Sequence, residues 1–287
     1  MTEITVEAIK SLRDRTGAGM MDCKEALEEA GGDEEEAVDL LRKKGASKAA
    51  KRAGRATDEG TVRVAGSDDG GPVAMVAVTS ETDFVAKNDE FVAFAERAAR
   101  AARDADGLPE GETRPGEELL DLPEDEPLRD ELNGLRAKIG ENLQLARWVR
   151  WEPADDAVVA DYVHFGDKIG VLVELGGVDD REEARALARD VAMHAAATDP
   201  AGVSPDDIPE EERERERKVL REQAEEQGKP PDIVEKIVEG RMRKFYEENA
   251  LLEQPFVRDP DVKVGDRVAK GGDDLEVRRF VRFEVGS

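Results

Sequence analysis

One arrangement of elements is indicated twice in this sequence, and it constrains the fold more than any other feature. Each time, two short runs rich in β-branched residues flank a glycine-containing turn, and an alanine-rich segment with helical spacing follows. The first unit covers residues 60–103 and the second covers residues 158–197. An offset of 96 residues places Val73 on Ile169 and Ala95 on Val191 without a gap. We therefore expect an α+β core of two related hairpin-plus-helix subdomains.

The segment before this core has the pattern of a small helical bundle. Residues 1–45 contain three apolar stripes with helical spacing, separated by glycine-containing breaks at residues 15–19 and 31–32. Cys23 lies on one of these stripes, where a free cysteine usually packs in the core. A bundle of this size has a thin core and no room for a deep catalytic pocket, so a docking module is expected. We expect a linker at residues 46–57, a first core subdomain at 58–140 and a second at 141–287.

Three further segments have recognisable patterns. Residues 209–249 contain two charged helical stretches around the turn Gly228-Lys229-Pro230-Pro231, which predicts a protruding antiparallel helical hairpin, or coiled-coil arm. Residues 104–131 carry twelve acids, two bases and four prolines, which is typical of an exposed and partly extended connection. Residues 132–150 have the pattern of a helix, and residues 262–287 are expected to end in a strand that completes a sheet.

The overall charge limits the classes of partner. Acidic residues outnumber basic residues by 69 to 43, and the net charge of −26 argues against direct binding of nucleic acid. Residues 41–57 contain seven bases and no acid, which indicates either a patch facing an acidic partner or, as we favour, a helix C-terminus. The sequence has no run of 18 apolar residues, no apolar segment after Met1 and one cysteine. We therefore expect no membrane association, no disulfide and a cytoplasmic location.

Patterns that would support catalysis or metal binding are not found in the sequence. The two histidines, His164 and His194, have no second set of ligands at the spacing that a metal site requires. Gly17-Ala18-Gly19 follows a helical segment and lacks the third glycine of a dinucleotide loop. We therefore expect no cofactor and no enzymatic activity. From the residues alone, the remaining features favour a non-catalytic helical adaptor or scaffold.

Several stretches, however, resemble the elongation factor Ts family. Thr82-Asp83-Phe84-Val85-Ala86-Lys87 is similar to the central signature of that family, and residues 12–27 are similar to its opening segment. Shorter matches follow in the family's order at residues 138–142, 192–196, 228–230, 239–242, 254–257 and 282–286. The resemblance implies a guanine-nucleotide exchange factor that binds elongation factor Tu in its GDP-bound and nucleotide-free forms and promotes the release of GDP. It also implies that residues 1–45 form a ubiquitin-associated-like module.

The resemblance assigns roles to eleven residues. It implies that the module docks on the nucleotide domain of elongation factor Tu through Leu12, Arg13, Met20 and Met21. It implies that Ile169, Gly170 and His194 face the same partner from the second core subdomain. It implies that Thr82, Asp83, Phe84 and Val85 intrude beside the Mg²⁺ and phosphate site of that partner.

The residues around Phe84 leave two interpretations open. Taken by themselves, they favour a helix that is capped by Thr82 or Asp83 and stapled by a packed Phe84. The family resemblance instead implies that Phe84 is an exposed wedge beside the charge of Asp83.

The composition generates a test of adaptation to salt. Only 15 of the 43 bases are lysine, and a surface rich in carboxylates and poor in lysine is typical of proteins that work in very high salt. Salt of about 1 M shortens the Debye length to roughly 3 Å, so the carboxylates no longer repel one another. Adaptation to salt predicts a free energy of unfolding that is higher in molar KCl than in low salt, and an ordinary acidic surface is the alternative interpretation. Equal stability in both would favour an ordinary acidic protein.

Overall fold

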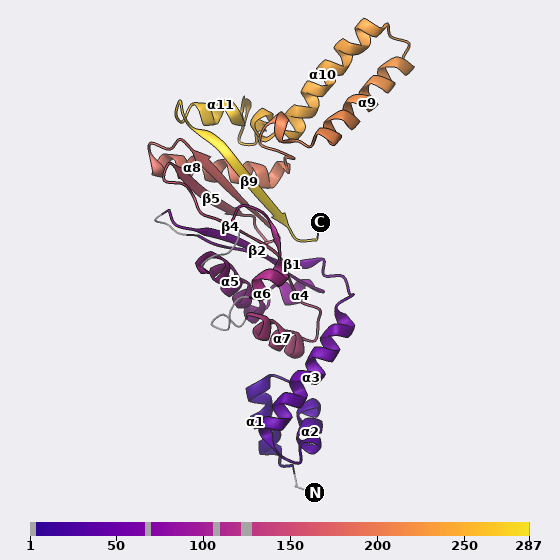
Figure 1. Cartoon of the computed structure of the whole chain (residues 1–287), viewed down its shortest axis with the longest axis vertical. Helices are drawn as coiled ribbons and strands as arrows, with labels where there is room; N and C mark the ends of the chain where they lie inside the picture. Colours follow the sequence, from indigo (N-terminus) through magenta and orange to yellow (C-terminus); the bar gives the residue numbers. More distant parts are fainter. Residues whose placement is uncertain (1–3, 67–69, 106–109, 122–127, 287) are drawn as a thin grey trace.

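The computed structural model describes residues 4–66, 70–105, 110–121 and 128–286. Figure 1 shows a helical module at one end of the long axis, a layered α+β core in the middle and a helical arm at the other end. This arrangement confirms the expected fold class. None of the helices in the described ranges is both long and apolar enough to cross a bilayer.

The helical module consists of α1 (Val6–Thr16), α2 (Met20–Glu29) and α3 (Glu34–Arg52). Thr5 caps α1 by accepting a hydrogen bond from the N–H of Ala8, and Gly17 ends the helix with a φ of 67°. Leu12, Cys23 and Leu27 are fully buried between the helices, so the cysteine packs in the core as expected. α3 continues to residue 52, and the first half of the expected linker at 46–57 is therefore helical.

The first half of the core is a four-stranded antiparallel sheet with helices on one face. The strand order is β1-β2-β4-β3. The elements are β1 (Glu59–Ala65), β2 (Val73–Ser80), α4 (Asp83–Ala86), α5 (Asp89–Asp104), β3 (Arg114–Pro115), α6 (Gly116–Leu120), α7 (Leu128–Ile139) and β4 (Gln144–Trp151).

The helix expected over residues 132–150 is wrong for its second half. α7 ends at Ile139 because Gly140 has a φ of 83° and donates its N–H to the carbonyl oxygen of Arg136. The chain then forms β4, which pairs with β2. The sheet of the first subdomain therefore extends past the boundary that we expected at residue 140.

The acidic connection at residues 104–131 is only partly exposed. α6 lies within it and places Leu119 and Leu120 in the core beneath β4, and Leu128 at the start of α7 is also buried. Residues 106–109 and 122–127, which also belong to this expected connection, lie outside the described residues.

The second half of the core is a three-stranded antiparallel sheet in the order β5-β6-β9. The last strand completes this sheet, as the sequence predicts. The elements are β5 (Ala157–Val163), β6 (Ile169–Gly176), α8 (Arg181–Thr198), η1 (Pro205–Asp207), η2 (Leu251–Glu253), β7 (Pro255–Phe256), β8 (Asp259–Lys263), α11 (Val264–Ala269) and β9 (Glu276–Glu284).

The two sheets pack face to face, and each carries helices on its outer face (Figure 1). Alternate residues of β2 divide between the layers: Val76 packs against α5, whereas Met75 packs against the second sheet. In β6, Val173 packs against α8, whereas Leu172 faces the first sheet. The core therefore has four layers, in the order helices, sheet, sheet and helices, and the two subdomains share the apolar layer of side chains between the sheets.

The gapless offset of 96 residues is wrong in detail, although each half does contain a hairpin followed by a helix. The offset pairs Val76 with Leu172, but Val76 faces the helices of its subdomain whereas Leu172 faces the other sheet. Because side chains alternate along a strand, a shift of one residue moves every side chain to the other face. The repeat is therefore one of element order and not of residue position.

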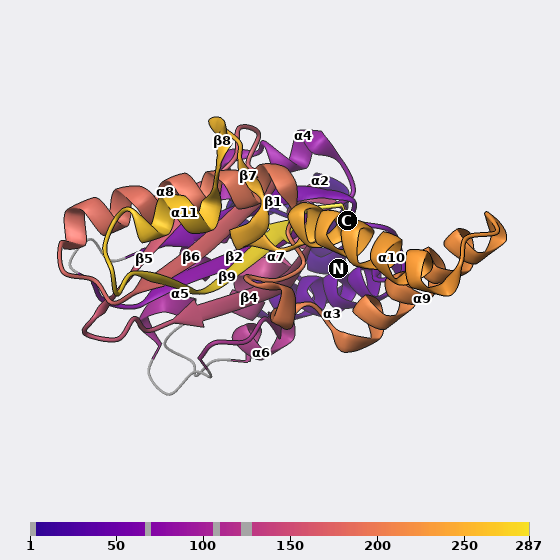
Figure 2. The ribbon, with the colours of Figure 1, turned by 90° about the horizontal axis from the view of Figure 1, so that it is seen from above.

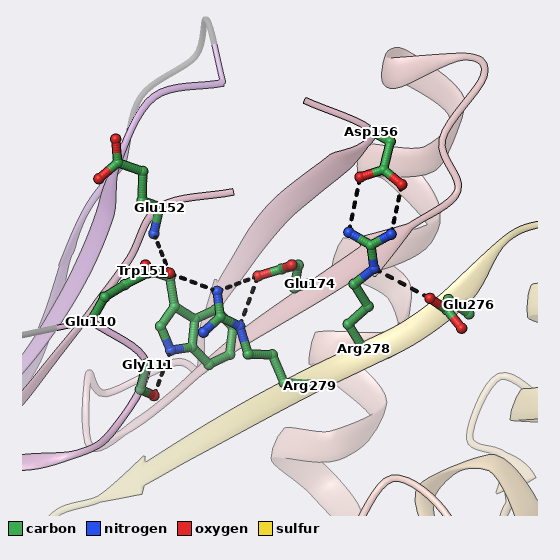
Figure 3. Close-up of polar contacts among 9 residues, drawn as sticks. All are labelled: Glu110, Gly111, Trp151, Glu152, Asp156, Glu174, Glu276, Arg278 and Arg279. Carbon is green, nitrogen blue, oxygen red and sulfur yellow. Dashed lines mark hydrogen bonds and ion pairs between the residues drawn. The ribbon is translucent and has the colours of Figure 1, made fainter. Parts of the chain in front are cut away.

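A polar cluster lies between the two sheets at the edge of the shared layer (Figure 3). The Arg279 guanidinium of β9 stacks over the Trp151 ring of β4, with its Cζ atom 4.4 Å from the ring centroid. Its Nε donates to Oε2 of Glu174 on β6 at 2.8 Å, and its Nη2 donates to Glu110 at 3.1 Å. Glu174 is 4% exposed, and this pairing compensates the burial of its charge.

The arm consists of α9 (Glu210–Glu226) and α10 (Pro231–Asn249), as the sequence predicts. Its thin apolar seam includes Leu220, Ala224, Val234, Val238 and Met242. Figure 2, which shows the ribbon from above, shows the arm extending beyond the layers of the core.

The close approach of the two sheets at Gly170 generates a stability test. A Cβ atom at this position would lie 2.5 Å from Cγ1 of Val62 and 2.9 Å from Sδ of Met75. We expect Gly170→Ala to lower the free energy of unfolding by about 1–3 kcal/mol, because overpacking would force the sheets apart. Urea denaturation measures this change. The matched control is Gly240→Ala in α10, where no atom lies within 4 Å, and it should not destabilise. Equal effects of the two substitutions would contradict the account.

Candidate functional site

The candidate site is the turn between β2 and α5. Thr82 is the N-cap of α4, and its Oγ1 accepts the N–H of Val85 at 3.5 Å. α4 is a single turn, and Asn88 starts α5 anew by accepting the N–H groups of Glu90 and Phe91. The alanine-rich helical segment expected at the end of the first unit is therefore preceded by a separate short helix, and the break sets α4 apart as a short projecting turn.

The two interpretations of Phe84 are distinguished by its exposure. The Phe84 side chain is 84% exposed, so it does not pack as a staple. Val85 is the residue of this turn that packs against the core of the first subdomain. An aromatic ring held in water on a short helix is the feature that a wedge requires.

Asp83 is exposed beside the ring and forms an ion pair with Lys87, with 2.9 Å between Oδ2 and Nζ. This hydrogen bond to Lys87 is the main reason that the pKa of Asp83 is lowered, and Lys168 of the β5–β6 turn adds a smaller attraction. The carboxylate is therefore ionised at neutral pH, and a negative charge lies next to Phe84.

The backbone of the turn is held by residues that lie far away in the sequence. Both Oε atoms of Glu141 accept hydrogen bonds from Thr82, one from its N–H at 3.1 Å and one from its Oγ1 at 2.7 Å. The neighbouring Glu81 accepts the N–H of Asn142 at 2.6 Å and pairs with Arg55 at 3.3 Å. The hydrogen bond from Asn142 lowers the pKa of Glu81, and Arg55 lowers it further.

A hollow of about 500 Å³ opens beside the turn. Its walls come from β1, α4 and the β5–β6 turn at residues 166–168. Phe165, the residue before these, is 98% exposed. Sequence reasoning missed it, although an aromatic residue directly before Gly166-Asp167 in a predicted hairpin turn was an available signal.

The four module residues that the resemblance singles out do not share one environment. Met21 is 66% exposed and Met20 is 38% exposed, both in the first turn of α2, and Arg13 is exposed on α1. Leu12 is fully buried in the module core. The exposed pair of methionines offers an adaptable apolar surface, whereas Leu12 belongs to the module core.

The three residues assigned to the second subdomain lie largely within the fold. Ile169 is half-buried against the second core, Gly170 lies between the sheets and His194 is fully buried on α8. The exposed residue that His194 touches is Val257, which is 46% exposed.

His194 is fixed by hydrogen bonds at both ring nitrogens. Nδ1 accepts the N–H of Val257 at 3.1 Å, so Nε2 carries the proton and donates to Oε1 of Gln254 at 2.8 Å. Burial lowers the pKa of His194, and the bond to Gln254 opposes only part of this shift. The ring is therefore neutral at pH 7 and acts as a structural support.

No metal centre is indicated by the part of the chain that the structure describes. Within those ranges, three or more His, Cys, Asp or Glu side chains do not gather in a way that could hold a metal ion. The turn itself presents one exposed aromatic ring, one carboxylate and a backbone held by hydrogen bonds.

Comparison with known proteins identifies relatives along the whole chain. A family model described as Elongation factor TS matches residues 81–287. The elongation factor Ts of Aquifex aeolicus (strain VF5) is 45% identical over 290 residues, covering 99% of this chain and 98% of its own length. That of Halorhodospira halophila (strain DSM 244 / SL1) is 48% identical over 289 residues, covering 99% and 92%. That of Prosthecochloris aestuarii (strain DSM 271 / SK 413) is 40% identical and covers all of both chains. The resemblance found in the sequence is confirmed.

The buried histidine generates a test of pH dependence. Because its folded pKa lies below the ordinary value of 6.5, the unfolded chain binds a proton first as the pH falls. The stability that neutral His194 contributes is therefore lost below about pH 6.5. We expect His194→Gln to be less stable than the wild type at pH 7.5. The difference should shrink by at most about 1.4 kcal/mol per pH unit below 6.5. Denaturant melts at several pH values measure it, and a constant difference would contradict the account.

Proposed function

The chain belongs to the elongation factor Ts family, and we propose that it releases GDP from elongation factor Tu by inserting the turn at residues 82–85 beside the partner's Mg²⁺ and phosphate site. Members of this family are nucleotide exchange factors and partners of elongation factor Tu, and they work in translation elongation. They change the affinity of another protein for its nucleotide and do not catalyse a chemical reaction.

The observation that carries the proposal is the exposure of Phe84. A phenylalanine ring gains about 1.5–3 kcal/mol on full burial, and this ring is 84% exposed in the free chain. Most of that gain is therefore available when the ring enters an apolar gap of the partner. Val85 packs against the core and holds the turn in place. Insertion of Phe84 is therefore expected to move groups of the partner and not the turn itself.

The mechanism follows from thermodynamic linkage. A GTPase holds GDP through the amides of its phosphate loop and through a bound Mg²⁺ ion. A partner that fits the nucleotide-free shape weakens GDP binding, and GDP weakens binding of that partner by the same factor. The charge of Asp83, next to the inserted ring, would disturb the hydrogen bonds that order the metal's water shell.

Two further contacts complete the proposed interface. Arg13, Met20 and Met21 dock the module on the nucleotide domain, and Leu12 contributes as part of the core of that module. In the second subdomain, His194 acts from the interior by holding the exposed Val257, while Ile169 and Gly170 fix the end of β6. Phe165, which directly precedes the residues 166–168 that line the hollow, is a second exposed aromatic ring that could contact the partner.

The alternative function is an adaptor that binds a partner and leaves nucleotide affinity unchanged. The exposed Met21 and the arm would serve an adaptor equally well. The exposed ring on a rigid turn favours the exchange factor, because an adaptor has no need of a wedge. A cytoplasmic location and the division of the chain at residues 45 and 57 stay predictions, whereas the sheet of the first subdomain extends past residue 140.

Removal of the wedge tests the proposal. We expect Phe84→Ala to keep the fold, because the ring contributes little to the core, and to lower the maximal rate of GDP release by about tenfold. This factor corresponds to about 1.4 kcal/mol of lost transition-state stabilisation. Stopped-flow measurement with fluorescent GDP on elongation factor Tu gives the maximal rate and the half-saturating concentration of the chain.

The control is the double variant Met20→Asp with Met21→Asp in the module. It should raise the half-saturating concentration and leave the maximal rate nearly unchanged, because it affects docking and not insertion. A Phe84→Ala variant that releases GDP at the wild-type maximal rate would contradict the wedge. A wild-type chain that leaves the GDP release rate unaltered would support the adaptor.

A further inference from the structure

Two adjacent residues, Glu141 and Asn142, join the turn to the chain that leaves the helical module. They follow α7, where the positive φ of Gly140 ends the helix and directs the chain toward the turn. Asn142 is 4% exposed and Glu141 is half-buried, so both side chains lie in the body of the protein. Both lie in a stretch, residues 138–142, that resembles the family, but neither the resemblance nor the proposed mechanism assigns them a role.

Glu141 controls the hydrogen-bonding direction of Thr82. The Thr82 hydroxyl donates to Oε1 of Glu141 at 2.7 Å and accepts from the N–H of Val85 at 3.5 Å. Since a hydroxyl has a single proton, the bond to Glu141 turns its lone pairs toward Val85. The second carboxylate oxygen accepts the N–H of Thr82 at 3.1 Å. One side chain therefore fixes both the backbone and the cap of α4.

Asn142 forms hydrogen bonds to the chain segment that leaves the helical module. Its Nδ2 donates to the carbonyl oxygen of Arg55 at 2.9 Å and lies 3.5 Å from that of Ala53. These carbonyls directly follow α3, the helix that leads out of the module. The backbone N–H of Asn142 donates to Glu81, which in turn pairs with the Arg55 side chain. Asn142 thus bonds to the segment that follows the module helix, and its neighbour Glu141 bonds to the start of the turn.

The exposed ring makes this support necessary. Phe84 has little contact with its own chain, so its direction is set almost entirely by the backbone of α4. α4 has only four residues and is too short to be stable without outside bonds. A turn that had to be ordered during binding would lose conformational entropy at that step.

We propose that Glu141 is a positioning residue for nucleotide exchange, which holds the turn in the orientation that inserts Phe84 into the nucleotide domain of the partner. With Asn142, it ties that orientation to the end of the docking module, so that docking and insertion occur in one geometry. The inference rests on the proposed wedge role of Phe84 and adds the residue that prepares the wedge.

The first measurement uses the free chain and needs no partner. Amide hydrogen exchange, read by mass spectrometry on a peptide covering residues 80–88, compares the wild type with Glu141→Ala and Glu141→Gln. We expect about tenfold faster exchange of the turn amides in Glu141→Ala, with the module peptides unchanged. Glu141→Gln keeps an acceptor for the Thr82 hydroxyl but loses the one for its N–H, so it should be intermediate. Unchanged exchange in both variants would overturn the proposal.

The second measurement is a double-mutant cycle in the GDP-release assay. We expect Glu141→Ala to lower the maximal release rate about tenfold without raising the half-saturating concentration by more than about twofold. If Glu141 acts only through the wedge, Glu141→Ala combined with Phe84→Ala should be no slower than Phe84→Ala alone. Glu211→Ala on the exposed face of α9 is the matched control and should match the wild type in both quantities.

The outcomes separate the two claims. Multiplicative losses in the double variant would show that Glu141 acts independently of Phe84 and would overturn the inference while the wedge stands. If Phe84→Ala has no effect, the proposed function fails, and a defect that remains in Glu141→Ala would overturn the inference as well. A thermal melt of Glu141→Ala that matches the wild type excludes global unfolding as the cause of its slower release.

Discussion

The face-to-face packing of the two sheets is the constraint on which the rest of the structure depends. Val62, Met75 and Leu172 form one apolar layer between the sheets, and Gly170 permits their close approach. At the edge of this layer, Arg279 of the second sheet pairs with the buried Glu174 of the same sheet and stacks over Trp151 of the first sheet, and this stack joins the two subdomains. Because neither sheet can cover its inner face alone, the subdomains form one rigid unit. The turn that carries Phe84 and the β5–β6 turn are therefore held side by side.

The functional features of this molecule are apolar side chains that the rigid unit leaves exposed to water. Phe84 and Phe165 are aromatic rings exposed to water, and each directly neighbours in sequence a residue that lines the hollow beside α4. Their backbones are tied down, by Glu141 in one case and in the other by the bond from the Val62 N–H to the Asp167 carbonyl oxygen. An exposed ring on a fixed backbone costs little entropy to bury, and this property suits a protein that works by entering another protein.

The sequence contained enough information for the hairpins, the arm and the final strand, because their periodicity and turn residues agree with the fold. β4 was mistaken for helix for a physical reason. A bulge at Ala146 adds one residue to the strand, so Leu145, Trp148 and Val149 are buried at the spacing of a helix face. The exposure of Phe84 could not be deduced from composition, because the same residues are compatible with a capped helix that packs Phe84 and with a turn that exposes it. The hydrogen bonds of Glu141 and Asn142 join residues that are about 60–90 positions apart in the sequence. No local sequence pattern predicts them.

The central claim is that the turn acts on the Mg²⁺ and phosphate site of the partner, and the magnesium dependence of exchange tests it most directly. The rate of GDP release from elongation factor Tu is measured with and without a saturating amount of the chain, first at millimolar Mg²⁺ and then with the ion removed by a chelator. Because loss of the ion is part of what the turn achieves, the factor by which the chain accelerates release should be severalfold smaller without Mg²⁺. An acceleration of the same size in both conditions would contradict the account.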